Sequence, residues 1–251
     1  FARRADFGRY MADLFQRHQA VNGSSTSLTH IRAQATSLDT GPTSSTVTLD
    51  NGKRLTARLA VLATSNERPA VPEMFQGDVC QHSGFLPDPW ELDRLASLAL
   101  DVPILVLGTG LTASDVIIAL AAHGHTGPID SVSRSGLLPM DQNPVPDQES
   151  MWERFLYTPP RFIKKHGALA SASEILRRLR CDIAERAGEG KTWHGAFDDL
   201  RDAARTVWPD LPLVEQQRFR RHLKSWYETR RFRIAPQVQA VLDARQKAGR
   251  L

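Results

Sequence analysis

Residues 102–120, VPILVLGTGLTASDVIIAL, constrain the fold more than any other part of this sequence. The apolar residues 104–107 predict a buried strand, and the apolar residues after the glycines recur at helical spacing. Gly108, Gly110 and Ala113 fit the pattern Gly-x-Gly-x-x-Gly/Ala, in which each small residue serves a turn, a close phosphate approach or helix–strand packing. PIDSVSRSG predicts a second strand, so the segment predicts a Rossmann-like unit that binds a dinucleotide.

The end of that second strand favours NADP(H) over NAD(H). A ribose 2′-hydroxyl is usually held by Asp or Glu, whereas a 2′-phosphate needs a cation. Ser133 and Arg134 stand at this position without an acidic neighbour. The alternative is that Arg134 only faces solvent or stacks on adenine. The residues predicted to hold the nicotinamide cofactor are Gly108, Thr109, Gly110, Leu111, Thr112, Ser133 and Arg134.

Composition predicts a globular protein of the reducing cytoplasm. The 251 residues are 41% hydrophobic and 24% charged, and no apolar run approaches the ~20 residues that span a bilayer. The first ten residues lack the apolar segment of a secretory signal. Cys80 and Cys181 are far apart in the sequence, which argues against a disulfide framework and a zinc site. We therefore expect no metal and no membrane partner.

The basic charge is concentrated in residues 218–233, RFRRHLKSWYETRRFR. Phe219, Leu223, Trp226 and Tyr227 fall at helical spacing, which predicts one helix with a buried apolar stripe. Its basic face would lie in water or against an anionic cofactor. Basic residues interleaved with aromatics also occur in single-strand binders, but we expect no nucleic-acid partner here because a basic stripe alone is a weak signal.

The residues before the glycine turn predict a helix followed by a small antiparallel sheet. RADFGRYMADLFQRH predicts a helix with Tyr10, Leu14 and Phe15 on one side. Asp50-Asn51-Gly52 between two alternating runs predicts a hairpin within a β-meander. The continuous apolar run LAVLA, residues 59–63, predicts a strand buried on both faces. After the βαβ segment, LLPMDQNPVPDQE leads into a mostly helical region.

Several segments together resemble a family of FAD/NAD(P)-binding proteins that includes FAD-dependent urate hydroxylase-like and amine-oxidising flavin monooxygenases. They are RADFGRY (4–10), LATSN (62–66), GTGLTASD (108–115), SRSGLLP (133–139), LRDAARTVW (200–208) and RFRIAP (231–236). The resemblance implies an FAD site and an NADPH site in one protein. It implies FAD contacts at Thr64 and Ser65, where the family has glycine in place of Ser65.

The resemblance also implies a domain plan within an α/β fold. Residues 1–75 would be the C-terminal part of an FAD-binding domain with an antiparallel β-meander, 76–145 the NAD(P)-binding Rossmann-like unit, and 146–251 a helical region. No fingerprint for the FAD pyrophosphate precedes the meander. We therefore expect an internal piece of a longer flavoprotein, inactive and without stoichiometric FAD on its own.

The implied function is an FAD-dependent NADPH oxidoreductase, a monooxygenase that hydroxylates a small nitrogenous substrate. The alternatives are an NAD(P)H:flavin oxidoreductase without oxygen insertion and a nucleotide-binding regulator without turnover. Residues 151–162, MWERFLYTPPRF, offer aromatic walls for a substrate pocket or belong to the core. The sequence identifies no catalytic residue and leaves the oligomeric state open, which suits a cofactor that performs the chemistry itself.

Two further groups of polar residues have structural explanations. His123 and His125 flank Gly124 at the predicted helix end, where glycine adopts the left-handed conformation and histidine lies near the last carbonyls. Solvated pairing with nearby arginines three or four positions apart explains a set of acids without catalysis. These acids are Asp198, Asp199, Asp202 and Asp210.

Overall fold

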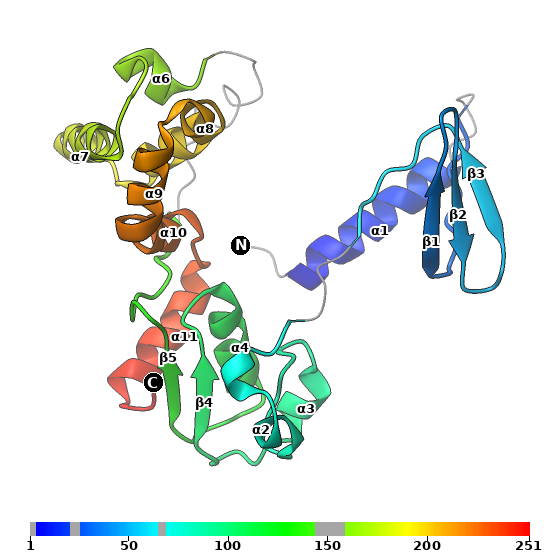
Figure 1. Ribbon diagram of the computed structural model, residues 1–251. Coiled ribbons are helices and arrows are strands. Elements are labelled where there is room, and N and C mark those ends of the chain that lie inside the picture. The colour runs from blue at the N-terminus through cyan, green and yellow to red at the C-terminus, as the bar shows by residue number, and fades with distance from the viewer. Residues whose placement is uncertain (1–3, 21–25, 65–68, 144–158) are drawn as a thin grey trace. The chain divides into compact units, whose positions relative to one another are not determined.

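The computed structural model describes residues 4–20, 26–64, 69–143 and 159–251. The chain divides into two compact units, residues 1–68 and 69–251, called unit 1 and unit 2 below (Figure 1). Over the described residues the structure is mixed α/β, with many helices, one three-stranded sheet and one two-stranded sheet. None of the described helices is both long and apolar enough to cross a membrane.

Unit 1 contains the predicted helix and meander. Helix α1 (Arg4–Ala20) precedes strands β1 (Ala35–Thr40), β2 (Ser45–Leu49) and β3 (Arg54–Ala57). The three strands form an antiparallel sheet in the order β1-β2-β3, with Val47 opposite both Leu38 and Leu55. Gly52 has φ +79° and its N–H donates to the carbonyl oxygen of Leu49, so the predicted hairpin turn is confirmed.

Two predictions for unit 1 are wrong. Residues 59–63 form no strand, and Leu59, Val61 and Leu62 are 78%, 77% and 75% exposed. A strand buried on both faces needs neighbours that pair with its backbone and layers that cover it, and the described residues supply neither to this segment. In α1, Leu14 is half-buried as predicted, but Tyr10 is 57% exposed.

Unit 2 contains a βαβ element with its own core. Strands β4 (Ile104–Leu107) and β5 (Ile129–Val132) are parallel and are joined through α4 (Leu111–Ala122). Ile117, Leu120 and Ile129 are at most 2% exposed. Short elements precede β4: a 3-10 helix at Glu73–Phe75, α2 (Asp78–Gln81) and α3 (Leu92–Ala96). The two described strands make one βαβ repeat and do not extend to a full Rossmann sheet.

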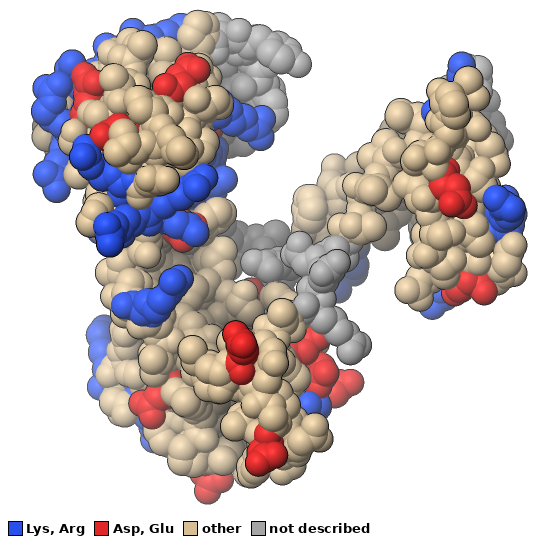
Figure 2. Space-filling model, viewed as in Figure 1, with Lys and Arg blue, Asp and Glu red and all other residues tan. Residues whose placement is uncertain are grey.

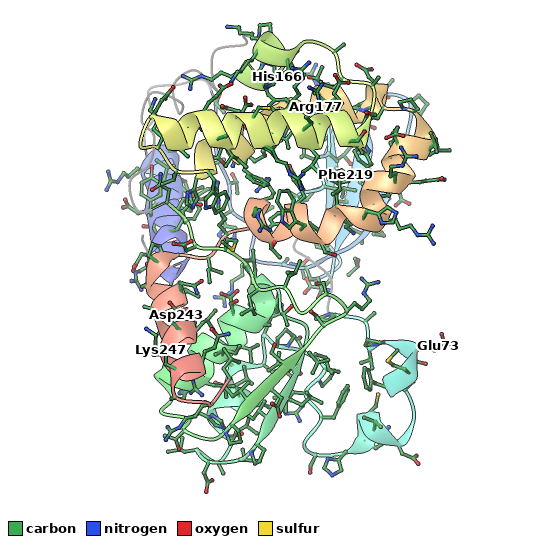
Figure 3. All side chains as sticks on the ribbon, turned by 90° about the vertical axis from the view of Figure 1, so that its left-hand side faces the viewer. Glu73, His166, Arg177, Phe219, Asp243 and Lys247 are labelled. Atoms are coloured by element: carbon green, nitrogen blue, oxygen red, sulfur yellow. The ribbon has the colours of Figure 1, made fainter. Side chains whose placement is uncertain are left out.

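The last helix, α11 (Pro236–Lys247), packs beside α4 and adds Leu242 to the βαβ core. Figure 3 labels Asp243 and Lys247 on this helix. Beyond it, the Arg250 carbonyl oxygen accepts a hydrogen bond from Ile129 N–H of β5, at 3.0 Å. Sequence analysis groups this segment with the helical region, whereas the contacts join it to the βαβ element.

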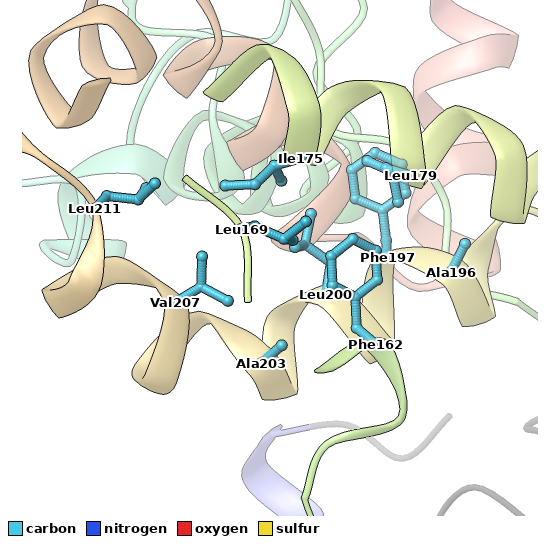
Figure 4. Close-up of a cluster of buried hydrophobic side chains, with 10 residues drawn as sticks. All are labelled: Phe162, Leu169, Ile175, Leu179, Ala196, Phe197, Leu200, Ala203, Val207 and Leu211. Atoms are coloured by element: carbon cyan, nitrogen blue, oxygen red, sulfur yellow. The ribbon is translucent and has the colours of Figure 1, made fainter. Parts of the chain in front are cut away.

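The other helices of unit 2 surround a second core. They are α6 (Arg161–His166), α7 (Ala172–Gly188), α8 (His194–Asp210), α9 (Leu213–His222) and α10 (Lys224–Arg231). Figure 4 shows this core, in which Phe162, Leu179 and Phe197 are at most 2% exposed. Of the aromatic segment 151–162, residues 151–158 lie outside the described residues, and Phe162 belongs to the core.

The basic segment 218–233 differs from its prediction in two ways. It forms α9 and α10 with a break at Leu223 rather than one helix. Trp226 and Tyr227 still pack against the second core, as the stripe predicts. Arg233 does not face water, because its side chain is 5% exposed and pairs with Asp198. Many other Lys and Arg side chains gather on the surface of these helices in Figure 2.

The aspartates of α8 are less solvated than predicted. Asp199 pairs with Arg186 of α7 at 2.7 Å, and both side chains are less than 20% exposed. Asp198 pairs with Arg233 as well as with Arg201, three positions along α8. Because Arg186 comes from α7 and Arg233 from the connection between α10 and α11, these ion pairs fasten α8 to other parts of unit 2, a role that local spacing does not predict.

We expect Leu179→Ala to lower the free energy of unfolding of unit 2 by about 2–5 kcal/mol, because a 1% exposed leucine leaves a cavity when it is truncated. All five tryptophans lie in unit 2, so tryptophan fluorescence during urea unfolding measures this change. The matched control is Leu213→Ala at a 65% exposed leucine, which should change the value by less than about 0.5 kcal/mol. Equal effects would contradict the assignment of the core.

Candidate dinucleotide site

The carboxyl ends of β4 and β5 meet at one edge of the sheet, where Leu107 pairs with Val132. The Gly108 N–H donates to the Val132 carbonyl oxygen at 2.8 Å. Ser131 Oγ donates to the Gly108 carbonyl oxygen at 2.7 Å. The glycine turn is therefore tied to the end of β5, at the edge where open α/β sheets bind their ligands.

The two glycines of the turn differ in whether the backbone conformation there requires glycine. Gly108 has φ +123°, in the region that strongly favours glycine. Gly110 is the N-cap of α4 with φ −86°, and a Cβ added there meets no atom within 4 Å. Its missing side chain leaves open space in front of the helix. Ala113 is 7% exposed, which agrees with its predicted role in close helix–strand packing.

The first turn of α4 is open to an anion. No side chain caps the helix at Gly110, so its first N–H groups are left for solvent or a ligand. Leu111 is half-buried and Thr112 is exposed in this turn. The free N–H groups and the positive end of the helix dipole attract a phosphate, and Gly110 leaves room for it.

Ser133 and Arg134 lie just after β5, beside the glycine turn. Ser133 Oγ is 2.7 Å from Thr109 Oγ1 and accepts a hydrogen bond from Gly136 N–H at 3.0 Å. Arg134 is exposed, and no carboxylate that the structure describes pairs with it. As far as the described residues show, a cation is therefore available at the position predicted for a 2′-phosphate.

Sequence analysis includes the loop after Arg134 in the segment SRSGLLP but predicts no contacts for it. Gly136 has φ +64°, and the Leu137 carbonyl oxygen lies 2.7 Å from Thr109 Oγ1. The glycine in SRSG predicts a turn here. The hydrogen bonds that join this loop to Thr109, about 25 positions earlier, leave no pattern in the sequence, because they depend on how β4 and β5 pair.

The residues predicted for FAD lie in unit 1. Thr64 is exposed and belongs to no helix or strand. Ser65 lies outside the described residues. The structure therefore brings together the seven residues predicted for the nicotinamide cofactor, and it describes only Thr64 of the two residues predicted for FAD.

Beyond the sheet edge, the chain is fixed to the helical core through His194. Its Nε2 donates to the Asp141 carbonyl oxygen at 3.0 Å. Burial lowers the pKa of His194, the hydrogen bond to Asp141 opposes this shift, and the charge of Arg233 adds to it. This hydrogen bond fastens residue 141 to the start of α8.

A charged hollow of about 440 Å³ lies beside α6 and α7 in the helical part of unit 2. Within it, Lys165 Nζ donates to Asp182 at 2.6 Å, and Arg186 pairs with Asp199 at 2.7 Å. His166 Nε2 also lies 2.9 Å from Asp182, and Figure 3 labels this histidine on α6. These charges already satisfy one another, so they hold α6, α7 and α8 together.

His123 and His125 occupy the end of α4. Gly124 has φ +84°, and the His125 N–H donates to the Leu120 carbonyl oxygen at 3.0 Å, so the predicted glycine-terminated helix end is confirmed. His125 is 5% exposed, and its Nε2 lies 2.9 Å from the Val102 carbonyl oxygen. This contact ties the helix end to the start of β4, away from the glycine turn.

Comparison with known proteins gives one family match. A family model described as FAD-NAD(P)-binding matches residues 1–67, which lie within unit 1. No curated protein and no solved structure matches the chain. The match supports a relationship to FAD/NAD(P)-binding proteins and, in general terms, a nucleotide-binding flavoprotein oxidoreductase. The glycine turn at residues 108–113 lies outside the matched segment and depends on its own geometry.

The two glycines allow a prediction about stability. Gly108→Ala should lower the free energy of unfolding of unit 2 by about 1–3 kcal/mol, because alanine is strained at φ +123°. Gly110→Ala should stay within about 0.5 kcal/mol of the unsubstituted chain, since its Cβ enters open space. Urea unfolding of both variants checks the difference. Similar losses would mean that the turn does not have this geometry.

Proposed function

We propose that this chain contributes to an FAD-dependent NADPH oxidoreductase, a monooxygenase that hydroxylates a small nitrogenous substrate. One observation carries the proposal: an open glycine turn at the carboxyl edge of a βαβ element in a chain whose other unit matches an FAD-NAD(P)-binding family. The resemblance to urate hydroxylase-like and amine-oxidising flavin monooxygenases supports the reaction type. Cytoplasmic action on a small molecule is part of the same proposal.

The residues at the turn suit the pyrophosphate of a nicotinamide dinucleotide. The first N–H groups of α4 would donate to the phosphate oxygens, and the open space at Gly110 would admit them. Thr112 is exposed in the same helical turn and adds a hydroxyl donor. These contacts bind and orient the cofactor without any proton transfer by the protein.

The choice of NADPH rests on the loop after β5. The Arg134 guanidinium offers two parallel N–H donors to a 2′-phosphate. Ser133 Oγ accepts hydrogen bonds from Thr109 Oγ1 and Gly136 N–H, so its own hydroxyl hydrogen remains for a phosphate oxygen. The neighbouring Ser135 is exposed, and its Oγ accepts only a long 3.5 Å hydrogen bond from Leu137 N–H. Ser133 and Arg134 are therefore the proposed phosphate contacts, and Ser135 adds a further hydroxyl beside them.

FAD, when bound, supplies the hydride acceptor for NADPH and the electron donor for oxygen. The family match to residues 1–67 and the proposed contacts of Thr64 and Ser65 support its place in the proposal. No side chain is proposed to act as an acid or a base. The protein's contribution is to hold the nucleotides and the substrate in the geometry that the transfer requires.

We expect Arg134→Glu to weaken NADPH binding by about 1–3 kcal/mol, the range for a charge-assisted hydrogen bond, and to change NADH binding much less. Titration calorimetry with each nucleotide measures both values. The matched control is Lys247→Glu, which makes the same change of charge at an exposed position on α11. Equal losses for NADPH and NADH would remove Arg134 from the 2′-phosphate site.

The redox proposal is tested by separating its two halves. We expect anaerobic stopped-flow mixing of the FAD-supplied protein with NADPH to bleach the flavin absorbance. Oxygen added afterwards should restore it and hydroxylate an amine or purine substrate. Nucleotide binding without bleaching would contradict the redox function. Bleaching followed only by free hydrogen peroxide, with every amine and purine tried, would favour the oxidoreductase without oxygen insertion.

A further inference from the structure

Three polar groups and one carbonyl oxygen form a continuous line of hydrogen bonds at the candidate site. Gly136 N–H donates to Ser133 Oγ at 3.0 Å, Ser133 Oγ lies 2.7 Å from Thr109 Oγ1, and Thr109 Oγ1 lies 2.7 Å from the Leu137 carbonyl oxygen. We call this set of four residues the hydroxyl relay. It joins the residue between the two glycines of the turn to both ends of the loop that carries Arg134.

The Thr109 hydroxyl is the donor in two of the hydrogen bonds of the hydroxyl relay. Its single hydrogen lies within reach of the Leu137 carbonyl oxygen and of Ser133 Oγ, and both of these oxygens accept. Ser133 Oγ also accepts a hydrogen bond from the Gly136 amide. The hydroxyl hydrogen of Thr109 is therefore shared between two acceptors of the loop.

The hydroxyl relay holds the Arg134 loop in one conformation. Thr109 is 8% exposed, whereas Arg134 and the residues that follow it are exposed. Gly136 at φ +64° bends the loop back so that the Leu137 carbonyl oxygen reaches Thr109. Thr109 is thus the buried point to which an exposed loop is attached. Without the Thr109 hydroxyl, the loop would keep its internal hydrogen bonds, from Gly136 N–H to Ser133 Oγ and from Leu137 N–H to Ser135 Oγ, but would lose those to Thr109.

We propose that Thr109 is a positioning residue that sets the cofactor preference of the site by fixing where Arg134 stands. The inference rests on the proposed function, because it concerns the same NADPH site. Thr109 itself would not contact the 2′-phosphate, since its hydroxyl hydrogen is already donated to Leu137. Its effect reaches NADPH through the loop, which presents Arg134 to the phosphate at a smaller entropic cost.

A purely structural role would have a different consequence. The same hydrogen bonds could stabilise the turn alone, and their loss would then weaken NADPH and NADH alike. NADH has no 2′-phosphate, so only the ratio of the two dissociation constants reports the position of Arg134. This ratio is therefore the measurement that separates positioning from stability.

The experiment compares Thr109→Val with Thr109→Ser by titration calorimetry using NADPH and NADH. Valine keeps the branched shape and loses the hydroxyl, whereas serine keeps the hydroxyl. We expect Thr109→Val to reduce the preference for NADPH about five- to tenfold, the order expected for one net hydrogen bond. Thr109→Ser should retain the preference. Ser133→Ala removes the next member of the hydroxyl relay and should reduce the preference in the same direction.

A double-substitution cycle completes the test. In an Arg134→Gln background, Thr109→Val should change the ratio no further, because the group that it positions is gone. An unchanged ratio in both Thr109→Val and Ser133→Ala would overturn the positioning role, as would an undiminished effect in the Arg134→Gln background. If the unsubstituted chain binds neither nucleotide, the proposed function fails, and the inference fails with it. Tryptophan fluorescence confirms that each variant is folded.

Discussion

The candidate site depends on the attachment of the glycine turn to the end of β5. Two hydrogen bonds, from Gly108 N–H to Val132 and from Ser131 to the Gly108 carbonyl oxygen, set the turn beside the strand that precedes Arg134. Because β4 and β5 are parallel, this one attachment brings residues about 25 positions apart to the same edge. The hydrogen bond between Thr109 and Ser133 joins the two strand ends at the same edge.

The two units differ in how far the apolar residues of the sequence are buried in the structure. In unit 2 the apolar residues of α4 meet α11 and β5, so Ile117 and Leu120 are buried. In unit 1 the family match covers the sequence, yet the most apolar run, residues 59–63, is exposed. A continuous apolar run encodes a strand covered on both faces, and a strand needs partners to form. Strand β4 has the partner β5 but is not buried on both faces as predicted, since Leu105 and Leu107 are 62% and 50% exposed. Residues 59–63 pair with no described strand and are exposed.

Features that depend on near neighbours were predictable from the sequence. The Asp50-Asn51-Gly52 turn, the strand before Gly108 and the left-handed Gly124 each follow from residues within one turn of the chain. Features that depend on distant partners were not. The pairing of Arg233 with Asp198 spans 35 positions, and the packing of α11 on α4 spans more than 100, so neither leaves a local pattern. The break at Leu223 likewise interrupts a regular helical stripe.

Thr109, the residue between the two glycines, shows that the Gly-x-Gly motif does not specify every residue on which the candidate site depends. The pattern Gly-x-Gly leaves this position unspecified, because its side chain has no fixed task toward the pyrophosphate. In this chain the position holds a buried threonine, and its hydroxyl is within hydrogen-bond reach of a loop that the motif does not include. A buried hydroxyl must find an acceptor, so the fold that buries Thr109 also requires a carbonyl oxygen at that place. The loop carrying Arg134 supplies it, which couples the geometry of the phosphate turn to that of the strand end where cofactors are distinguished.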